Sequence, residues 1–401
     1  MSEMSYLEKL LDGVEVEWKT LGSIAELKRG TSITKKDVID GTIPVVAGGR
    51  TPAYYHNTSN RDGQTIVIAG SGAYAGFVSW WEEPIFVSDA FTVKPHNILL
   101  PRYCYHFLMN MQQQLHEFKS GGGVPHVYPR DVSPILIPIP CPDNPEKSLA
   151  IQSEIVRILD KFTALTAELT AELTARKKQY NYYRDRLLSF EEGEVEWKTL
   201  GDVTKKWYSG GTPTAGNPEY YDGGDIPWLR TQEIKFSDVC ETEVKITAAA
   251  LKKTSAKWIP ENCVIVAISG ATAGRSAINK IALTTNQHCG CLEIDSKKAL
   301  YRYVFHWVSF NYENIKALGQ GARGDLNSTI IKNFKLPIPY ADDPEKSLEE
   351  QARIVAILDK FDTLTGSISE GLPREIELRQ KQYEYYRDLL FSFPKPDSVT
   401  N

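Results

Sequence analysis

The chain has 401 residues, is 42% hydrophobic and 24% charged, and carries a net charge of −5. This composition is typical of a soluble globular protein with two or three domains. The sequence contains no apolar run of 18 residues, so we expect no membrane span. The N-terminus lacks the basic head and apolar core of a signal peptide. We therefore expect a cytoplasmic protein with no membrane contact. Six cysteines without a CxxC pair argue against a disulfide scaffold or a zinc ribbon, so we expect no metal and no cofactor.

The acidic residues are concentrated outside two large segments. Residues 13–140 hold 11 Lys+Arg and 11 Asp+Glu, and residues 193–340 hold 18 and 15. Residues 341–401 hold 8 and 13. The overall acidity therefore permits a basic patch on either large segment, which a nucleic-acid binder requires.

Four stretches occur twice, in the same order, which shows an internal duplication. They are EVEWKTLG at 15 and 194, PEKSL at 145 and 344, IVRILDKFTALT at 155 with IVAILDKFDTLT at 354, and QYNYYRD at 179 with QYEYYRD at 382. The offset grows from 179 to 199 between the first two, and weaker matches place this 20-residue difference early in the second copy. The frame is kept while the loops between these stretches vary, a pattern typical of one fold with two different binding surfaces.

Each copy begins with a segment of short strands and helices. Apolar runs predict strands at 64–69, 85–93 and 263–268, and helices are expected near 101–117 and 300–316. AGSGAYAG (69–76) and AISGATAG (267–274) follow equivalent strands as glycine loops. The expected class is mixed α/β (α+β).

A long helix follows each of these segments. Residues 151–190 contain no Gly or Pro and carry apolar residues at steps of three and four, which predicts one amphipathic helix. The second copy repeats the stripe, but Gly371-Leu372-Pro373 interrupts it, so we expect a kink or a restart at Pro373. We expect the two helices to pair as an antiparallel coiled coil; the alternative is that each packs only on its own domain. The side chains expected at the helix pair or a partner interface are Ile155, Phe162, Leu169, Leu173, Tyr180, Tyr183, Ile354, Phe361, Tyr383 and Tyr386.

The order of variable domain, helix, variable domain and helix, on this repeated frame, resembles the DNA specificity subunit of type I restriction–modification systems. SGGTP (209–213), which opens the second variable domain, adds to the resemblance. The tandem TAEL units at 166–169 and 170–173 are similar to those of the type IC group.

The resemblance implies two target recognition domains, 1–141 and 193–340, with helical spacer regions 142–192 and 341–401, related by an internal pseudo-twofold repeat. Each domain would read one half of a split, asymmetric site on double-stranded DNA. The helices would set the gap and bind two methyltransferase (modification) subunits, and two restriction (ATP-dependent translocase and nuclease) subunits would join them. In this group the number of TAEL units is linked to the length of the unread spacer.

Motifs for catalysis are weak in this chain, so we expect a non-catalytic subunit. It has no [DNS]PP[YFW] methyltransferase loop and no GxxxxGK[ST] phosphate loop. Asp225, Glu233 and Lys235 imitate the acid–acid–lysine set of a nuclease, which stays open as an alternative function. A third alternative is a two-headed interaction protein on a coiled-coil stalk. His106 and His306 occupy equivalent positions, and we expect packed helix residues rather than a catalytic base.

DNA contacts are expected from side chains in the variable loops. Lys and Arg bind phosphates, whereas Arg, Asn and Gln read base edges. In the first domain the candidates are Lys28, Arg29, Thr31, Arg50, Tyr74, His126 and Arg130. In the second domain they are Ser209, Gly211, Thr212, Arg230, Gln232, Arg275 and Arg323. The alternative for the glycine loops is a tight turn packed against the core.

Overall fold

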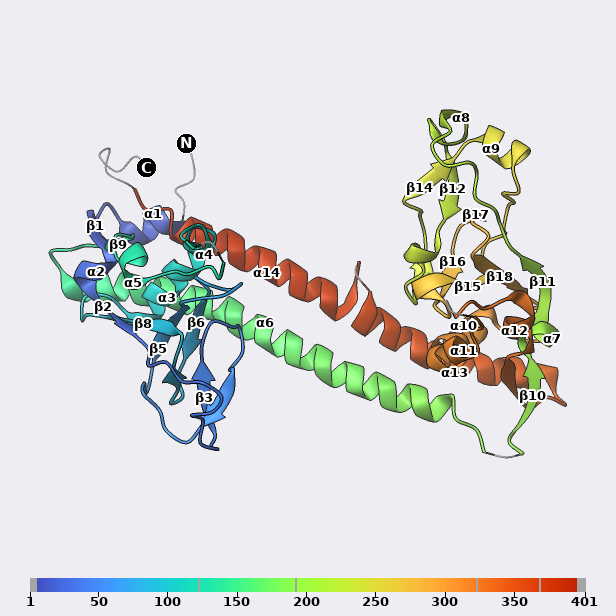
Figure 1. Ribbon diagram of the computed structural model, residues 1–401, viewed down its shortest axis with the longest axis horizontal. Coiled ribbons are helices and arrows are strands. Elements are labelled where there is room, and N and C mark those ends of the chain that lie inside the picture. Colours follow the sequence, from blue (N-terminus) through green and yellow to red (C-terminus); the bar gives the residue numbers. More distant parts are fainter. Residues whose placement is uncertain (1–5, 122, 192, 322–323, 368, 395–401) are drawn as a thin grey trace. The chain divides into compact units, whose positions relative to one another are not determined.

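The computed structural model describes residues 6–121, 123–191, 193–321, 324–367 and 369–394. The chain divides into two compact units (Figure 1). Unit 1 contains residues 1–171 and 375–401, and unit 2 contains residues 172–374. Both units mix helices and strands, so the predicted mixed α/β class is confirmed. None of the described helices is both long and apolar enough to cross a membrane.

Unit 1 contains a four-stranded antiparallel sheet in the order β2-β8-β5-β6, a three-stranded sheet β4-β3-β7 and the pair β1-β9. The strands are β1 Val16–Thr20, β2 Ala25–Arg29, β3 Ile43–Val46, β4 Tyr54–His56, β5 Thr65–Ala69, β6 Val78–Trp81, β7 Phe86–Val87, β8 Ala90–Pro95 and β9 Leu136–Pro140. Strand β5 reads TIVIA and is buried along its whole length. Such a β-branched run fits the centre of a sheet that is covered on both faces.

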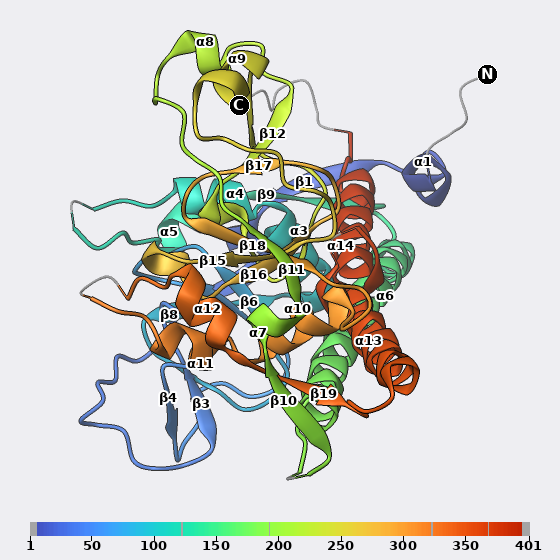
Figure 2. The same cartoon turned by 90° about the vertical axis from the view of Figure 1, so that its right-hand side faces the viewer.

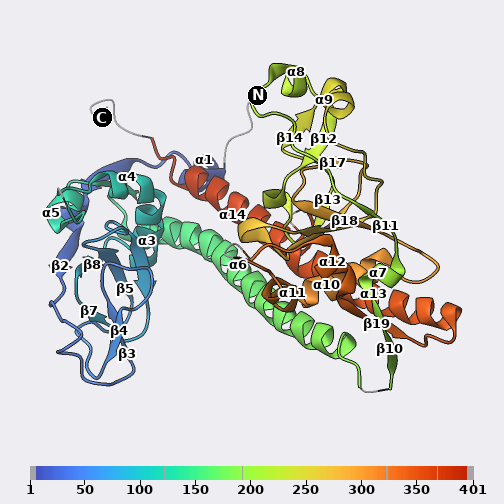
Figure 3. The ribbon, with the colours of Figure 1, turned by 45° about the vertical axis from the view of Figure 1, so that its right-hand side comes forward.

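Short helices accompany this sheet, and the helix Pro101–Asn110 lies against it (Figure 3). They are α1 Tyr6–Leu11, α2 Leu21–Ile24, α3 Pro101–Asn110, α4 Gln112–Glu117 and α5 Pro129–Val132. Helix α3 contacts β5, β6 and β8 and carries the fully buried Tyr103 into the core. The helix predicted at 101–117 is thus present, with a break at Met111.

The strand predicted at 85–93 is interrupted at Ser88 and Asp89. Val87 in β7 pairs with β3, whereas β8 begins at Ala90 and pairs with β5 and β2. The prediction of one continuous strand was wrong because the chain changes sheets at these two residues. This change places Asp89 at the surface beside the first glycine loop.

Unit 2 contains a five-stranded sheet β11-β18-β15-β16-β13, a three-stranded sheet β14-β12-β17 and the pair β10-β19 (Figure 2). Its strands are β10 Val195–Thr199, β11 Thr204–Tyr208, β12 Ile226–Leu229, β13 Asp238–Val239, β14 Val244–Ile246, β15 Val264–Ala267, β16 Ser276–Asn279, β17 Thr284–Thr285, β18 Cys289–Ile294 and β19 Lys335–Pro339. Its short helices are α7 Leu200–Val203, α8 Pro218–Tyr221, η1 Thr231–Glu233, α9 Ala248–Lys253, η2 Gly270–Thr272, α10 Tyr301–Phe310, α11 Tyr312–Ala317 and α12 Ser328–Asn333. Here too the predicted helix at 300–316 breaks once, at Asn311.

The longer second copy is explained by the segment between its first two sheet strands. Residues 30–64 connect β2 to β5, whereas residues 209–263 connect β11 to β15, so the early 20-residue difference is confirmed. The longer segment carries helices α8 and α9, which pack with β12 and β14 around the small core of Trp228 and Ile246. The extra residues thus enlarge one end of unit 2 and leave its central sheet intact.

The long helices also follow the sequence closely. Helix α6 spans Pro145–Leu187, six residues earlier at its start than predicted, because Asn144 accepts a hydrogen bond from the amide of Lys147 (3.1 Å) and Pro145 suits a first turn. The second run forms α13 Pro344–Gly366 and α14 Gly371–Leu390. The predicted interruption is confirmed, with the restart at Gly371, where φ is +79°.

Each long helix is fastened to the globular part of its own unit by a buried glutamine. The fully buried Gln152 accepts from the amide of Leu100 (2.9 Å) at the start of α3 and donates to the carbonyl of Ile98 (3.0 Å). In unit 2 Gln351 accepts from the amide of Leu300 at the same distance. A side chain of α6 or α13 thus satisfies the first free amide of the neighbouring helix, which would otherwise be unpaired.

Replacing Gln152 by Ala should lower the free energy of unfolding by about 1–3 kcal/mol, because the buried glutamine is lost and the partly buried amide of Leu100 loses its partner. Urea unfolding followed by tryptophan fluorescence measures this loss. Gln113→Ala, at an exposed position of α4, is the control and should change stability by no more than about 0.5 kcal/mol. Equal stability of the two variants would contradict the fastening role of Gln152.

Candidate nucleic-acid interface

Three predicted DNA-contact residues of unit 1 gather around one tyrosine that the sequence reading missed. The guanidinium groups of Arg29 and Arg130 lie 5.1 and 4.7 Å from the ring centroid of Tyr128. The ring of His126 stacks on Tyr128 with centroids 5.7 Å apart. Cationic groups on an aromatic face, next to a stacked ring, form a surface suited to phosphates and bases.

Local backbone features hold this cluster in place. His126 exchanges backbone hydrogen bonds with Ser120, and the amide of Tyr128 donates to the Asp131 carboxylate (2.8 Å) at the start of α5. Arg29 ends β2, and Gly30 follows it against the main chain of Val87 and Ser88. A Cβ at position 30 would collide with those carbonyls, so the close approach requires glycine.

A second group in unit 1 contains Arg50 and the tip of the first glycine loop. The Arg50 guanidinium lies 4.8 Å from the centroid of Tyr74 and 5.5 Å from that of Phe77. Tyr74 is 42% exposed, and it therefore offers part of its ring to solvent. The loop closes where the amide of Gly76 donates to the carbonyl of Ala69 (2.8 Å) at a φ of +84°, a conformation that favours glycine. The loop is therefore both a tight turn and a surface tip.

The two remaining candidates of unit 1 do not join these groups. Lys28 and Arg29 are consecutive residues of β2, so their side chains project to opposite faces. Thr31 is exposed, and its amide donates to the carbonyl of Val87 (2.9 Å). A cleft of about 340 Å³ lies beside them, with Arg29, Asp89, His126 and Tyr128 among its lining residues.

In unit 2 a hydrogen-bonded chain of polar side chains replaces the aromatic cluster. Thr212 donates to Gln287 (2.6 Å), whose amide nitrogen lies 3.1 Å from His288, and His288 lies 2.6 Å from the hydroxyl of Ser269. Ser209 donates to the carbonyl of Gln287 (3.4 Å). The carbonyl of Gly211, next to Thr212, accepts a hydrogen bond from the buried Trp228 indole (3.1 Å), which fixes the backbone at this point. Three predicted residues are thus brought together with Gln287 and His288, which sequence reasoning missed.

Arg230 and Gln232 have a different environment from the one predicted. The Arg230 guanidinium pairs with Glu233 (3.3 Å) and Glu243 (2.5 Å), and the Gln232 amide lies beside it. Two carboxylates already neutralise Arg230, which makes it a poor phosphate or guanine ligand. Its role as a leading base reader is therefore not favoured, although the residue types suited one.

Three further residues that the sequence analysis singled out are Glu233, Arg275 and Arg323. The Glu233 carboxylate also accepts from the amide of Glu243 (2.8 Å), so it is fully used within the protein and does not form a nuclease set with Lys235. Arg275 follows the second glycine loop and is partly exposed, and its amide donates to Thr272 (3.0 Å). Arg323 lies outside the described residues.

The helix-stripe residues divide between core and helix contacts. Ile155 and Ile354 are buried in the cores of units 1 and 2. Phe162 stacks on Tyr386 in unit 1, with centroids 5.3 Å apart. In unit 2 Phe361 contacts Tyr180 (5.8 Å) and Tyr183 (5.7 Å). Tyr383 packs against the core of unit 1, and Leu169 and Leu173 are half-buried.

His106 and His306 are buried side chains of α3 and α10, so the expectation of packed helix residues is confirmed. Each binds an aspartate of a long helix: His106 Nε2 lies 2.7 Å from Asp160, and His306 Nε2 lies 2.7 Å from Asp359. An arginine joins each pair, since Arg102 and Arg302 donate to the same two carboxylates. This Arg–Asp–His tie repeats in both units.

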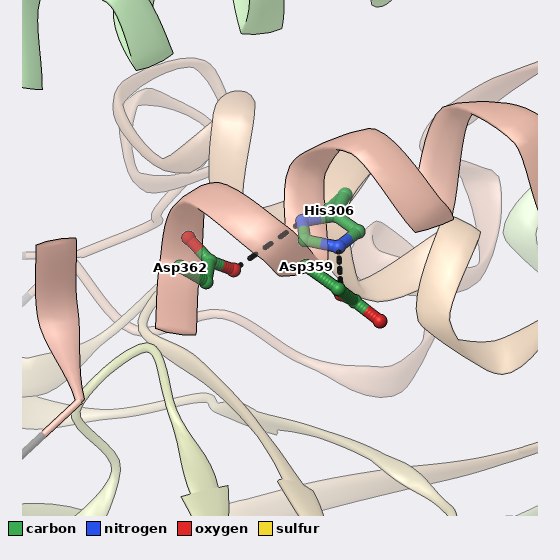
Figure 4. Close-up of side chains that lie close together, drawn as sticks. All are labelled: His306, Asp359 and Asp362. Atoms are coloured by element: carbon green, nitrogen blue, oxygen red, sulfur yellow. Dashed lines mark hydrogen bonds and ion pairs between the residues drawn. The ribbon is translucent and has the colours of Figure 1, made fainter. Parts of the chain in front are cut away.

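The tie of unit 2 has a second acid. Figure 4 shows Asp359 and Asp362 on either side of the His306 ring, and Asp362 lies 3.8 Å from Nδ1. One imidazole and two carboxylates can hold a metal ion, and these atoms lie within 4.8 Å of one another. The Asp359 carboxylate, however, accepts from the Arg302 guanidinium (2.6 Å), and this fixed positive charge opposes a cation. We interpret the cluster as a structural ion network.

Two arginines at the loop tips of unit 1 carry a positive charge that no nearby carboxylate in the described part of the chain pairs with. Arg29 and Arg50 are exposed, and within the described residues neither forms an ion pair. Both instead lie over aromatic rings, which orient the guanidinium without neutralising it. The structure therefore defines a class of protein: two binding domains on one frame, the first with free cations and aromatic rings at its loop tips, the second with a polar chain.

The comparisons identify the family. A model of the type I restriction modification DNA specificity domain matches residues 13–176 and again residues 192–378. The chain therefore belongs to the family of type I restriction–modification DNA specificity subunits, as the sequence predicted. These subunits select DNA rather than catalyse the reaction, and the chain is accordingly a specificity subunit and not an enzyme by itself.

Two Escherichia coli relatives span nearly the same length. The chain is 44% identical to the type I restriction enzyme EcoR124I/EcoR124II specificity subunit over 100% of both chains. It is 34% identical to the EcoprrI specificity subunit over 92% of this chain and 93% of that protein. A crystal structure of a type I S subunit from M. genitalium matches with a TM-score of 0.68 at 16% identity, covering 98% of this chain and 100% of that one, which shows a shared fold.

The Asp160 tie should make stability depend on pH. Burial acts to raise the pKa of Asp160, but hydrogen bonds from His106 and Arg102 outweigh it and hold this pKa below its ordinary value. Asp160→Asn should therefore cost about 1–2 kcal/mol at pH 7, a modest loss because water screens the partly exposed carboxylate. The loss should disappear as the pH falls below about 4, through the depressed pKa.

Urea titrations at pH 7 and pH 3 measure this difference. The control is Asp185→Asn, on the same helix α6, where the aspartate pairs with its neighbour Arg184 at the surface. That change should cost less than about 0.5 kcal/mol at either pH. A loss in Asp160→Asn that stays constant from pH 7 to pH 3 would contradict the tie.

Arg29 and Arg50 of unit 1, which form no ion pair among the described residues, should contribute to DNA affinity. Arg230 of unit 2, which two glutamates neutralise, should not. Arg29→Ala and Arg50→Ala should each weaken binding and lower the slope of log affinity against log salt by about 1. Arg230→Ala is the matched control and should leave the slope unchanged. Fluorescence anisotropy of the subunit with its methyltransferase partner, at several salt concentrations, measures both. An equal slope change in all three variants would refute the distinction.

Proposed function

We propose that the chain reads a bipartite, asymmetric site on double-stranded DNA and organises a type I restriction–modification complex around that site. One observation carries the proposal: the two units repeat their frame contacts but place different side chains at equivalent loop tips. Shared positions with unlike chemistry suit two domains that read two unlike half-sites. On this proposal residues 1–141 and 193–340 are the target recognition domains, and residues 142–192 and 341–401 are the helical spacer regions.

The proposed DNA surface of the first domain consists of the tips around Tyr128 and Tyr74. Arg29, Arg50 and Arg130 would bind phosphates or guanine edges, because their guanidinium groups are oriented by rings. In the second domain the polar chain from Thr212 to Ser269 would contact base edges. Lys28, Thr31, Ser209 and Arg275 would add contacts at the margins of these surfaces.

We infer that the long helices pair as an antiparallel coiled coil with internal pseudo-twofold symmetry and act as a ruler between the two half-sites. The ring contacts support this arrangement: Phe162 meets Tyr386, whereas the later Tyr183 meets the earlier Phe361. Helix α6 has 43 residues, which corresponds to about 64 Å at 1.5 Å per residue. This length suffices to separate two domains by about one turn of B-DNA, roughly 34 Å.

The proposed partners are two methyltransferase subunits and two restriction subunits. Two equivalent aromatic pairs support a partner that is present twice: Tyr182 with Tyr183 on α6, and Tyr385 with Tyr386 on α14. Tyr182 and Tyr385 are 57% and 65% exposed. Exposed aromatic residues of this kind are enriched at protein interfaces.

Co-expression with its methyltransferase, followed by long-read detection of methylated adenines, tests the function. The expected result is one motif with two dissimilar halves at a fixed spacing. A palindromic motif, or methylation without sequence preference, would overturn the proposal. Purified chain that cuts DNA alone with magnesium would instead support a nuclease.

Deletion of Thr170 to Leu173, one of the two TAEL units, should change the spacer and leave both half-sites intact. The deletion removes about 6 Å of helix and about 40° of rotation, a change of the size of one or two base pairs. The methylome of the deletion strain measures both properties at once. Altered half-sites in that strain would contradict the ruler.

A further inference from the structure

One polar cluster occurs at the same place in both units with its acid and its imidazole exchanged. In unit 1 the hydroxyl of Ser71 donates to the Asp89 carboxylate, and Ser71 forms a backbone bridge with His126. In unit 2 the hydroxyl of Ser269 bonds to the imidazole of His288 (2.6 Å). In unit 2 the position that corresponds to His126 is held by Asp325, whose carboxylate accepts from the amide of Gly270 (3.4 Å).

Backbone hydrogen bonds establish that these positions are equivalent. The amide of Gly70 donates to the carbonyl of Asp89 (3.1 Å), and the amide of Ile268 donates to the carbonyl of His288 (2.9 Å). Both bonds lie directly after the central strands β5 and β15. Asp89 and His288 therefore occupy one structural position, one residue before β8 and β18.

The other flank is equivalent by the same criterion. The backbones of Ser120 and His126 form a two-residue bridge, as do those of Gln320 and Asp325. The next residues, Val127 and Leu326, donate their amides to Gly70 and Ile268 respectively. The duplicated frame thus keeps the serine and gives its two flanking positions to an acid and a histidine, in opposite order in the two units.

The reversal changes the hydrogen-bonding character of the exposed side of each cluster. A carboxylate only accepts hydrogen bonds. Ser71 therefore donates its hydroxyl proton to Asp89, and the pair can only accept hydrogen bonds from a ligand. In unit 2 the Gln287 amide donates to Nε2 of His288, so the imidazole proton is on Nδ1 and is given to Ser269. The hydroxyl proton of Ser269 is then available to a ligand.

We propose that Asp89 and His288 are equivalent specificity-determining residues, which give the two domains opposite hydrogen-bonding preferences at one base pair of each half-site. This inference rests on the proposed function. Both side chains are exposed, and Asp89 lines the cleft of unit 1 with Arg29 and Tyr128. The cluster of unit 1 accepts the exocyclic amine of cytosine or adenine, and that of unit 2 donates to guanine or thymine.

The consequence is a preference for the orientation of one base pair. In the major groove each pair presents its amine on one base and a carbonyl acceptor on the other. An acceptor-only side chain therefore distinguishes C·G from G·C, or A·T from T·A, at its position. An amide both donates and accepts, so an asparagine at position 89 tolerates both orientations.

The test is the methylome of cells with the full chain and its methyltransferase, for wild type, Asp89→Asn and His288→Asp. Asp89→Asn should make one position of one half-site degenerate between a base pair and its flipped form. His288→Asp should reverse the preferred orientation at one position of the other half-site. Asp62→Asn is the matched control, because Asp62 is also exposed and accepts from a serine, Ser59 (2.8 Å), outside the cluster.

Binding of the purified complex to duplexes with single flipped pairs is the second measurement, and it serves any variant that methylates poorly. The wild type should prefer its own pair by about tenfold, and Asp89→Asn should lower this ratio to about threefold or less. A dissimilar two-part motif in wild type that stays unchanged in both variants, with unchanged binding ratios, overturns this inference alone. A wild type without such a motif overturns the proposed function itself.

Discussion

The structure depends on a carboxylate that each long helix presents to its globular domain. Asp160 and Asp359 each bind a buried histidine and an arginine on the helix that covers the central sheet. Removing the aspartate would leave a buried imidazole without its hydrogen-bond partner, a modest loss because the carboxylate itself is partly exposed to water. These contacts join α3 to α6 in unit 1 and α10 to α13 in unit 2, and they limit how far each globular part can move relative to its long helix.

This constraint separates the parts that must stay constant from the parts that are free to vary. The ties, the glutamine contacts and the paired strands β1-β9 and β10-β19 recur with the same partners in both units. The glycine loops use the same frame, yet their neighbours range from the stacked rings around Tyr128 to the polar chain around Gln287. Chemistry at the tips can change without loss of stability, because no tip residue takes part in a tie.

The sequence predicted the elements that the internal repeat marks, and it missed the residues that only the folded chain brings together. Repeated stretches and apolar periodicity located the long helices, the restart near Pro373 and the early difference between the copies. Tyr128 and His288 stand in unlike sequences, and only long-range backbone hydrogen bonds of their neighbourhood bring them near the glycine loops. Arg230 had the right residue type, but the two glutamates that neutralise it come from the fold around it. A sequence pattern shows which side chains are present, but it does not show which neighbouring side chains they will pair with in the fold.

The cores also explain why the second half of the chain matters to the first domain. Leu390, Phe391 and Phe393, which end and follow α14, are buried in unit 1, and Trp18 donates to the carbonyl of Pro394 (2.8 Å). Unit 2 is closed in the same way by Leu188, which follows α6. Each domain is completed by the segment after the other domain's long helix. We infer that a change in helix length therefore acts on both domains through rigid attachments, and that spacing and half-site recognition vary independently because they depend on different residues.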